Sequence, residues 1–129
     1  MTEITLIYDQ DEIVGFYGWD HAEYGEQGSD ILCAGISMIL QQGAAGIIEY
    51  LKIPATFSTN NETGYLGLFL NKPDEEKLKK LNMTISSYNQ IVLDKKREIN
   101  AIIGSMVIML DQLKEQYPDY MKIFEEEAN

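Results

Sequence analysis

The sequence has few cysteine, histidine and basic residues, and each shortage excludes a class of protein. One cysteine, Cys33, excludes an internal disulfide, and a single histidine, His21, leaves no repeated Cys and His spacing that would bind zinc. We therefore predict no metal ion and no cofactor. Ten Lys and Arg residues against 21 Asp and Glu give a net charge of −11. Because this charge repels a phosphate backbone, we predict no nucleic acid partner, whereas a basic protein or peptide is compatible.

The sequence also has no apolar run that approaches the roughly 20 residues needed to cross a bilayer. Its amino terminus, MTEITLIYDQ, carries acidic residues where a signal peptide carries basic ones. We therefore predict a cytoplasmic protein without membrane contact, whose cysteine stays reduced. A content of 45% apolar and 24% charged residues is typical of a globular chain. We predict a single domain over residues 1–129 with one hydrophobic core.

Runs of β-branched and aromatic residues predict five strands. They cover residues 4–8, 12–19, 55–58, 65–70 and 120–124. The stretch 20–29 is polar and contains two glycines, so it is predicted as a loop.

Two long helices are predicted between these strands. The first is a densely apolar stretch from Asp30 to Leu51, capped by Ser29 or Asp30 and closed by Pro54. Its glycines are expected where another backbone comes close. The second helix is the strongest periodic signal, because apolar residues repeat at i, i+3, i+4 and i+7 until Pro118. These residues are Ile99, Ile102, Ile103, Met106, Leu110, Leu113 and Tyr117.

The segment between the fourth strand and the second long helix is less regular. Pro73, followed by acidic residues, predicts a helix start with Leu78 and Leu81 facing inward. Residues 84–93 fit either a strand or a helix. The element order β-β-α-β-β-(insert)-α-β predicts an α+β fold, in which two long helices cover a small, mostly antiparallel sheet.

The only histidine and the only cysteine lie twelve residues apart in one loop-to-helix segment, HAEYGEQGSDILC. A thiol becomes a nucleophile when a base takes its proton or when a local field favours the thiolate. If the helix begins near Asp30, Cys33 lies in its first turn, where unpaired amides favour negative charge. Asp30, Cys33 and Ser37 then share one helical face. Asp30 would orient His21, and Ser37 would donate a hydrogen bond to the sulfur or to a reacting carbonyl.

A structural interpretation of the same residues stands beside the catalytic one. Cysteine in an apolar run is commonly a small buried side chain, and Ser37 is more often bonded to a backbone carbonyl than catalytic. Asp30 fits a helix cap equally well. Trp19 and Tyr24 would either form a pocket wall or hold the loop in place. Spacing alone favours this structural interpretation.

The stretch from Gly18 to Leu51 resembles the Prp (YsxB-like) family of ribosomal-processing cysteine proteases. The family pattern is a histidine-alanine loop followed by Gly-x-Asp-Ile-(Val/Leu)-Cys-Ala-(Ala/Gly)-x-Ser. This sequence has His21-Ala22 and then GSDILCAGIS from Gly28 to Ser37. The twelve-residue offset matches as well, so the resemblance joins two reactive residue types, their spacing and a flanking decapeptide.

The resemblance implies a cysteine endopeptidase that removes a short hydrophobic or aromatic amino-terminal extension from a large-subunit ribosomal protein precursor. It implies Cys33 as nucleophile and His21 as base, with Asp30 and Ser37 as supporting residues. It also implies a homodimer and a mobile loop over the site. The loop residues expected to meet the substrate are Trp19, Asp20, Tyr24, Gly25 and Gly28.

Two departures from the family pattern keep other interpretations open. Asp20 stands where the family usually has glycine directly before the histidine, and residues 72–97 form an insertion that compact members lack. One alternative is a weakly active or inactive Prp-like interaction protein that binds a ribosomal or phage partner. Another is a phage-encoded relative that processes capsid or scaffold proteins.

Overall fold

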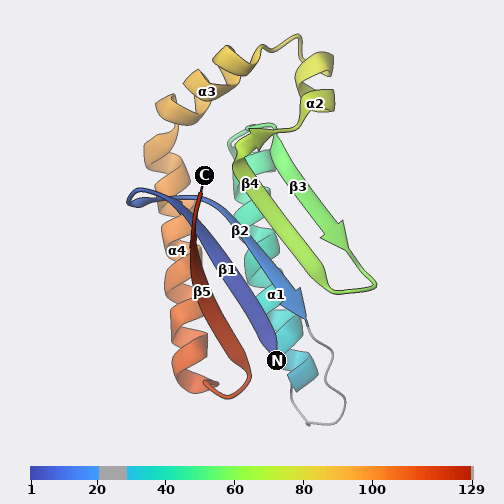
Figure 1. Cartoon of the computed structure of the whole chain (residues 1–129), viewed down its shortest axis with the longest axis vertical. Helices are drawn as coiled ribbons and strands as arrows, with labels where there is room; N and C mark the ends of the chain where they lie inside the picture. The colour runs from blue at the N-terminus through green and yellow to red at the C-terminus, as the bar shows by residue number, and fades with distance from the viewer. Residues whose placement is uncertain (21–28, 129) are drawn as a thin grey trace.

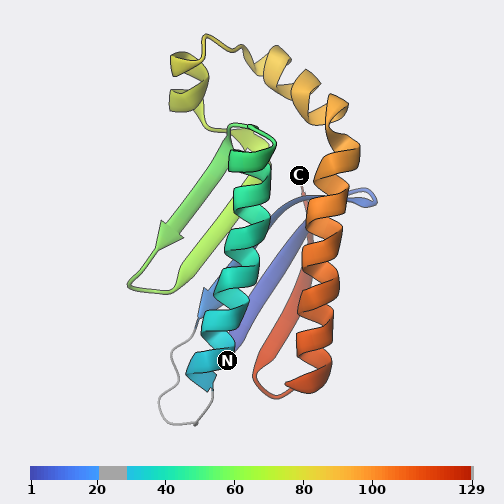
Figure 2. The same ribbon diagram turned by 180° about the vertical axis from the view of Figure 1, so that it is seen from behind.

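The computed structural model describes residues 1–20 and 29–128, with only the backbone described at Asp20, Ser29 and Asp30. The strands are β1 (Thr2–Asp9), β2 (Glu12–Asp20), β3 (Ala55–Asn60), β4 (Tyr65–Pro73) and β5 (Met121–Glu127). The helices are α1 (Ser29–Ala45), its π-helical continuation η1 (Gly46–Tyr50), α2 (Glu75–Lys80), α3 (Ile85–Asp94) and α4 (Lys96–Gln116). Helices α1 and α4 lie side by side against one face of the sheet, and no described helix covers the other face (Figure 1, Figure 2). The predicted α+β class is confirmed.

The five strands follow the spatial order β3-β4-β2-β1-β5. Within the described sheet, β1 pairs in parallel with β5, and the other pairs are antiparallel. Side chains alternate between the two faces of a strand, and the buried residues Thr2, Ile4 and Leu6 of β1 face the helices. Glu3 and Thr5 therefore lie on the open face. Strand β1, which lies between β2 and β5, thus carries one row of side chains into the core and another to the uncovered surface.

The first predicted helix is present, but its ends differ from the prediction. Ser29 and Asp30 both lie within α1, so neither is its cap. The helix continues through η1 to Tyr50, and the Leu51 amide donates to the Gly46 carbonyl at 3.0 Å. The sequence does not predict this π-helical end, because a single wider turn hardly changes the apolar periodicity.

Two glycines in this helical stretch mark the close approach of α4. A Cβ atom at Gly43 would overlap Met106, and one at Gly46 would overlap Ile102, whereas Gly35 has open space around it. The prediction that another backbone comes close at these glycines is therefore wrong. The neighbour is a side chain at Gly43 and Gly46, and Gly35 has none within 4 Å.

The second predicted helix corresponds to α4, which ends at Gln116, shortly before Pro118. The periodic stripe is confirmed, because four of its residues form the buried side of the helix. They are Ile99, Ile103, Met106 and Leu110. Tyr117 lies beyond the helix and is 42% exposed, so the buried stripe is shorter than predicted.

The irregular segment before α4 contains two short helices, which settles residues 84–93 as mainly helical. Asp74 caps α2 by accepting a hydrogen bond from the Lys77 amide at 3.2 Å. Leu78 is buried as predicted, but Leu81 is 58% exposed because α2 ends at Lys80. This segment connects β4 to α4 at the end of the molecule opposite to the start of α1 (Figure 1).

The helical stretch Ile31–Tyr50 is long and apolar enough, by length and composition, to cross a membrane, with a mean hydropathy of 1.7. The prediction that no apolar run approaches this length is therefore wrong. The few polar residues scattered through this stretch lower its mean hydropathy too little to distinguish it from a membrane-spanning helix. Leu32, Ile36 and Leu40 of this stretch are buried in the core. That packing is typical of the core helix of a globular domain.

Candidate active site

Cys33 lies on α1 at the end of the sheet where β1 begins and β2 ends. Its side chain is partly exposed, so the sulfur is not sealed inside the core. The Cys33 Sγ atom lies 3.0 Å from Oγ1 of Thr2, and either atom can donate the hydrogen bond between them. Thr2 is only 4% exposed. The nucleophile predicted from the sequence is therefore partly accessible and has a fixed polar neighbour.

Cys33 is the fifth residue of α1, because the helix begins at Ser29. The predicted position is in the first turn of the helix, and the structure places Cys33 at the start of the second. The unpaired amides of a helix belong to its first four residues, so the sulfur lies just beyond them. The helix dipole acts most strongly within the first turn. A group that touches the sulfur directly is therefore more important for stabilising a thiolate at this position.

Ser37 lies one helical turn after Cys33, on the same face of α1. Its Oγ atom accepts a hydrogen bond from Nε2 of Gln41 at 3.1 Å. An accepted bond uses an oxygen lone pair and leaves the hydroxyl proton available. Ser37 therefore keeps the donor that its predicted supporting role requires.

The loop predicted over the site lies outside the described residues. The same holds for the predicted base and loop residues His21, Tyr24, Gly25 and Gly28, and for the side chains of Asp20 and Asp30. The structure does define where the chain enters this segment, because Asp20 at the end of β2 pairs with Thr2 of β1. Thr2 therefore lies beside the residue that precedes His21 and also contacts Cys33.

Trp19, the last described side chain before this segment, begins an aromatic stripe on the open face of the sheet. The aromatic stripe consists of Trp19, Tyr65, Tyr17 and Phe69. The ring centroids of Trp19 and Tyr65 lie 4.5 Å apart, and those of Tyr17 lie 6.1 Å from Tyr65 and 6.4 Å from Phe69. Trp19 remains 39% exposed. The stripe is thus a connected aromatic surface that starts beside the predicted loop.

Polar groups accompany the aromatic stripe. Burial, and to a lesser degree the neighbouring Tyr17, raises the pKa of Tyr65 above its usual value, so its hydroxyl is protonated at neutral pH. The Tyr17 hydroxyl donates to Oε1 of Glu126 at 3.4 Å, and Glu3 is the cross-strand partner of Trp19. The stripe therefore combines apolar rings with nearby carboxylates.

The family model for Cysteine protease Prp matches residues 1–122. The chain belongs to the cysteine protease Prp family. The predicted family is thereby confirmed, and the match extends well beyond the segment from Gly18 to Leu51 that carried the resemblance. Among the curated proteins that were searched, none matches this sequence.

Solved structures, two of them of a Prp protease, share the fold of this chain. The essential ribosomal processing protease Prp from Staphylococcus aureus, in complex with a substrate peptide, has a TM-score of 0.69 at 17% identity, covering 98% of this chain and 100% of that one. The same protease with a covalently linked product peptide has a TM-score of 0.67 at 19% identity, with the same coverage. SMU.848 from Streptococcus mutans has a TM-score of 0.70 at 16% identity, covering 99% of each chain.

Thr2, which contacts Cys33, and Tyr65, which contacts Trp19, are not among the residues predicted for the site of this Prp-family chain. A signal for Thr2 exists, because it is a polar residue in phase with the inward-facing residues Ile4 and Leu6. Tyr65 and Phe69 likewise share a period of two, which places them on one strand face. The signal that they meet Trp19 is missing, because only the pairing of β2 with β4 brings them together.

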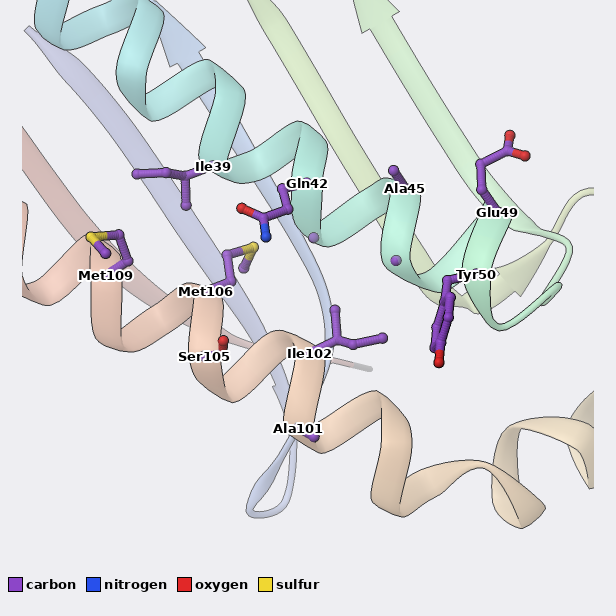
Figure 3. A pocket seen from close by; sticks show the side chains of 12 residues that line it. Ile39, Gln42, Ala45, Glu49, Tyr50, Ala101, Ile102, Ser105, Met106 and Met109 are labelled. Atoms are coloured by element: carbon purple, nitrogen blue, oxygen red, sulfur yellow. The ribbon is translucent and has the colours of Figure 1, made fainter.

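A groove of about 850 Å³ lies between α1 with η1 and α4 (Figure 3). Ile39, Ile102, Met106 and Met109 contribute much of its apolar lining, and Glu49 is its one carboxylate. Cys33 is not among the described residues that line the groove, so the groove is distinct from the position of the predicted nucleophile. Among the described residues of the chain, no three His, Cys, Asp or Glu side chains gather where they could hold a metal ion.

Proposed function

We propose that this protein is a cysteine endopeptidase that removes a short apolar or aromatic extension from the amino terminus of a large-subunit ribosomal protein. The observation that carries the proposal is the match of residues 1–122 to the cysteine protease Prp family. The partly exposed position of Cys33 is compatible with a nucleophile. A structural neighbour from Staphylococcus aureus is a ribosomal processing protease bound to a substrate peptide, which supports a peptide substrate.

In the proposed reaction, His21 takes the proton of the Cys33 thiol, and the thiolate attacks the carbonyl carbon of the scissile bond. The C–N bond then breaks, His21 gives the proton to the leaving amine, and a thioester remains on Cys33. Water, deprotonated by His21, hydrolyses the thioester and restores the thiol. Amide groups near Cys33 stabilise the oxyanion. Asp30 orients His21, and Ser37 donates a hydrogen bond to the sulfur or the reacting carbonyl.

The aromatic stripe is the proposed docking surface for the apolar part of the extension. Trp19 is two residues before His21 in the chain, so the stripe begins close in sequence to the proposed base, on the face of the sheet opposite to α1. Exposed rings attract aromatic and apolar side chains through burial and through offset or edge-to-face contacts. The loop residues Asp20, Tyr24, Gly25 and Gly28 would close over the bound segment. The net charge of −11 favours a substrate whose remaining part is basic.

The proposed setting is a cytoplasmic homodimer. The dimer rests on the family resemblance, and the single cysteine fits a reducing compartment. Light scattering of the purified protein measures the dimer directly, because one chain has a mass of 14.7 kDa. A species of one chain mass at micromolar concentration contradicts this part of the proposal.

A peptide with an apolar and aromatic extension followed by a basic segment tests the proposed activity. The wild-type protein should release the extension. Cys33→Ala and His21→Ala should each lower kcat/KM by about a thousandfold or more, because nucleophile and base act as one unit. Ser105→Ala on α4 is the matched control and should cut at the wild-type rate. Equal cutting by Cys33→Ala and the wild type contradicts the proposal.

An inactive interaction protein is the second candidate, and the presence of Asp20 in place of the family glycine favours it. This candidate predicts that the same peptide binds but is not cut. Asp20→Gly distinguishes an impaired protease, in which cutting increases, from a binding protein, in which it stays absent. Peptides from capsid or scaffold proteins test the phage alternative in the same assay.

The proposed insertion at residues 72–97 bears on partner choice. It lies at the opposite end of the molecule from the start of α1, which carries the proposed nucleophile (Figure 1). We therefore propose that this segment affects binding of a partner, and not the cleavage step. Its removal should change affinity for a full-length substrate more than the cutting of a short peptide.

A further inference from the structure

Thr2 has an unusual environment for a polar side chain. It is buried to 96%, since only 4% of it is exposed, and apart from Tyr88 it is the one buried side chain described that carries a polar group. A buried hydroxyl without a hydrogen-bond partner costs free energy, so such groups are normally paired. The partner that the described structure provides for Oγ1 of Thr2 is Sγ of Cys33, at 3.0 Å.

The position of Thr2 is determined by the strands on both sides of it. Its amide donates to the Tyr120 carbonyl at 2.9 Å, and its backbone pairs with Met121 of β5 and Asp20 of β2. A residue held between two neighbouring strands has little freedom to move. The Thr2 hydroxyl is therefore presented to the sulfur from a rigid support.

We propose that Thr2 is a positioning residue for the Cys33 thiolate, with its hydroxyl donating a hydrogen bond to Sγ. This inference rests on the proposed function, in which Cys33 is the nucleophile. In the thiol state either atom can be the donor. Once the sulfur has lost its proton, only the hydroxyl can donate, and the bond gains strength because its acceptor is charged. Thr2 therefore favours the ionised form and holds the sulfur in one orientation.

The location of Cys33 in α1 makes this contact more important. The sulfur belongs to the fifth helical residue, just beyond the unpaired amides, and the helix dipole is strongest within the first turn. The hydroxyl of Thr2 supplies a direct donor at that point. The same residue pairs through its backbone with Asp20, which precedes His21 in the chain.

The pH dependence of alkylation of the folded protein by iodoacetamide tests the proposal, because the thiolate is the reacting species. In Thr2→Val the midpoint of the rate-against-pH curve should move upward by about one to two pH units, since a hydrogen bond to a charged group is lost. Thr2→Ser keeps the hydroxyl and should restore the wild-type midpoint. Thr5→Val, on the open face of the same strand, is the matched control and should leave it unchanged.

A midpoint in Thr2→Val equal to that of the wild type overturns the proposal, and so does an equal shift in Thr2→Val and Thr2→Ser. Thr2→Ala provides a second hydroxyl-free variant if Thr2→Val fails to fold, and it must show the same upward shift. The assay needs no substrate. If the midpoint shifts in Thr2→Val but the wild-type protein cuts no peptide, the proposed protease activity is refuted and the role of Thr2 is supported. If the wild-type protein cuts the peptide but the midpoint does not shift, the protease activity is supported and the role of Thr2 is refuted.

Discussion

Replacement of Tyr88 by phenylalanine should measure how firmly the segment between β4 and α4 is attached to the sheet. Tyr88 on α3 is 1% exposed, and its hydroxyl donates to the Leu70 carbonyl of β4 at 2.8 Å. Leu70 lies where the register of β3 and β4 is irregular, between the pairs Thr56 with Phe69 and Ala55 with Pro73. The tyrosine hydroxyl thus provides a donor where the ladder is interrupted.

The expected cost of Tyr88→Phe follows from the group left behind. The ring still fills its place in the core, but the buried carbonyl loses its donor, which costs about 1–3 kcal/mol. An unfolding entropy of about 2.1 cal/mol/K per residue, applied to 129 residues, converts this into a fall in Tm of about 4–11 °C. The segment would then contribute to the stability of the whole domain.

Thermal unfolding followed by circular dichroism measures this change. Tyr50→Phe is the matched control, because Tyr50 is 80% exposed and its variant should unfold within about 1 °C of the wild type. Both variants should cut the test peptide equally well, since α3 lies far from the start of α1 (Figure 2). A Tm for Tyr88→Phe equal to that of the wild type refutes the reasoning.

Three further predictions follow from the structure. Burial raises the pKa of Tyr88, so at high pH the folded state keeps a proton that the unfolded state loses. The free energy of unfolding measured in urea should therefore fall as the pH rises above about 10. It should fall less in Tyr88→Phe, which has no hydroxyl to titrate. Gly35→Ala should raise the free energy of unfolding by about 0.5–1 kcal/mol, whereas Gly43→Ala should lower it, because a Cβ atom there overlaps a side chain of α4; equal effects in denaturant titrations contradict the packing. Trp19→Ala should raise KM for the peptide by about 3- to 10-fold, and Phe124→Ala, an exposed ring on β5, should not; equal effects on both would remove the aromatic stripe from substrate binding.

The elements of this fold could be predicted because their signals are local. The stripe of α4 repeats over several turns, and the strands alternate or run apolar between turn residues. The errors have physical causes. The start of α1 moved to Ser29 because helix ends depend on caps, which are weak signals. Leu81 is exposed because α2 ends before it, and a short helix leaves little periodicity to indicate its length.

The sequence by itself determined which residues are candidates for the chemistry, because it contains one thiol and one imidazole, and the family motif joins them. It also determined the class of fold, since periodicity follows from the repeat of the backbone within a single helix or strand. Only the tertiary structure decided that Thr2 touches Cys33 and that Trp19 meets Tyr65. These pairs are far apart in the chain, and their contact depends on the order and register of strands, which local periodicity does not encode.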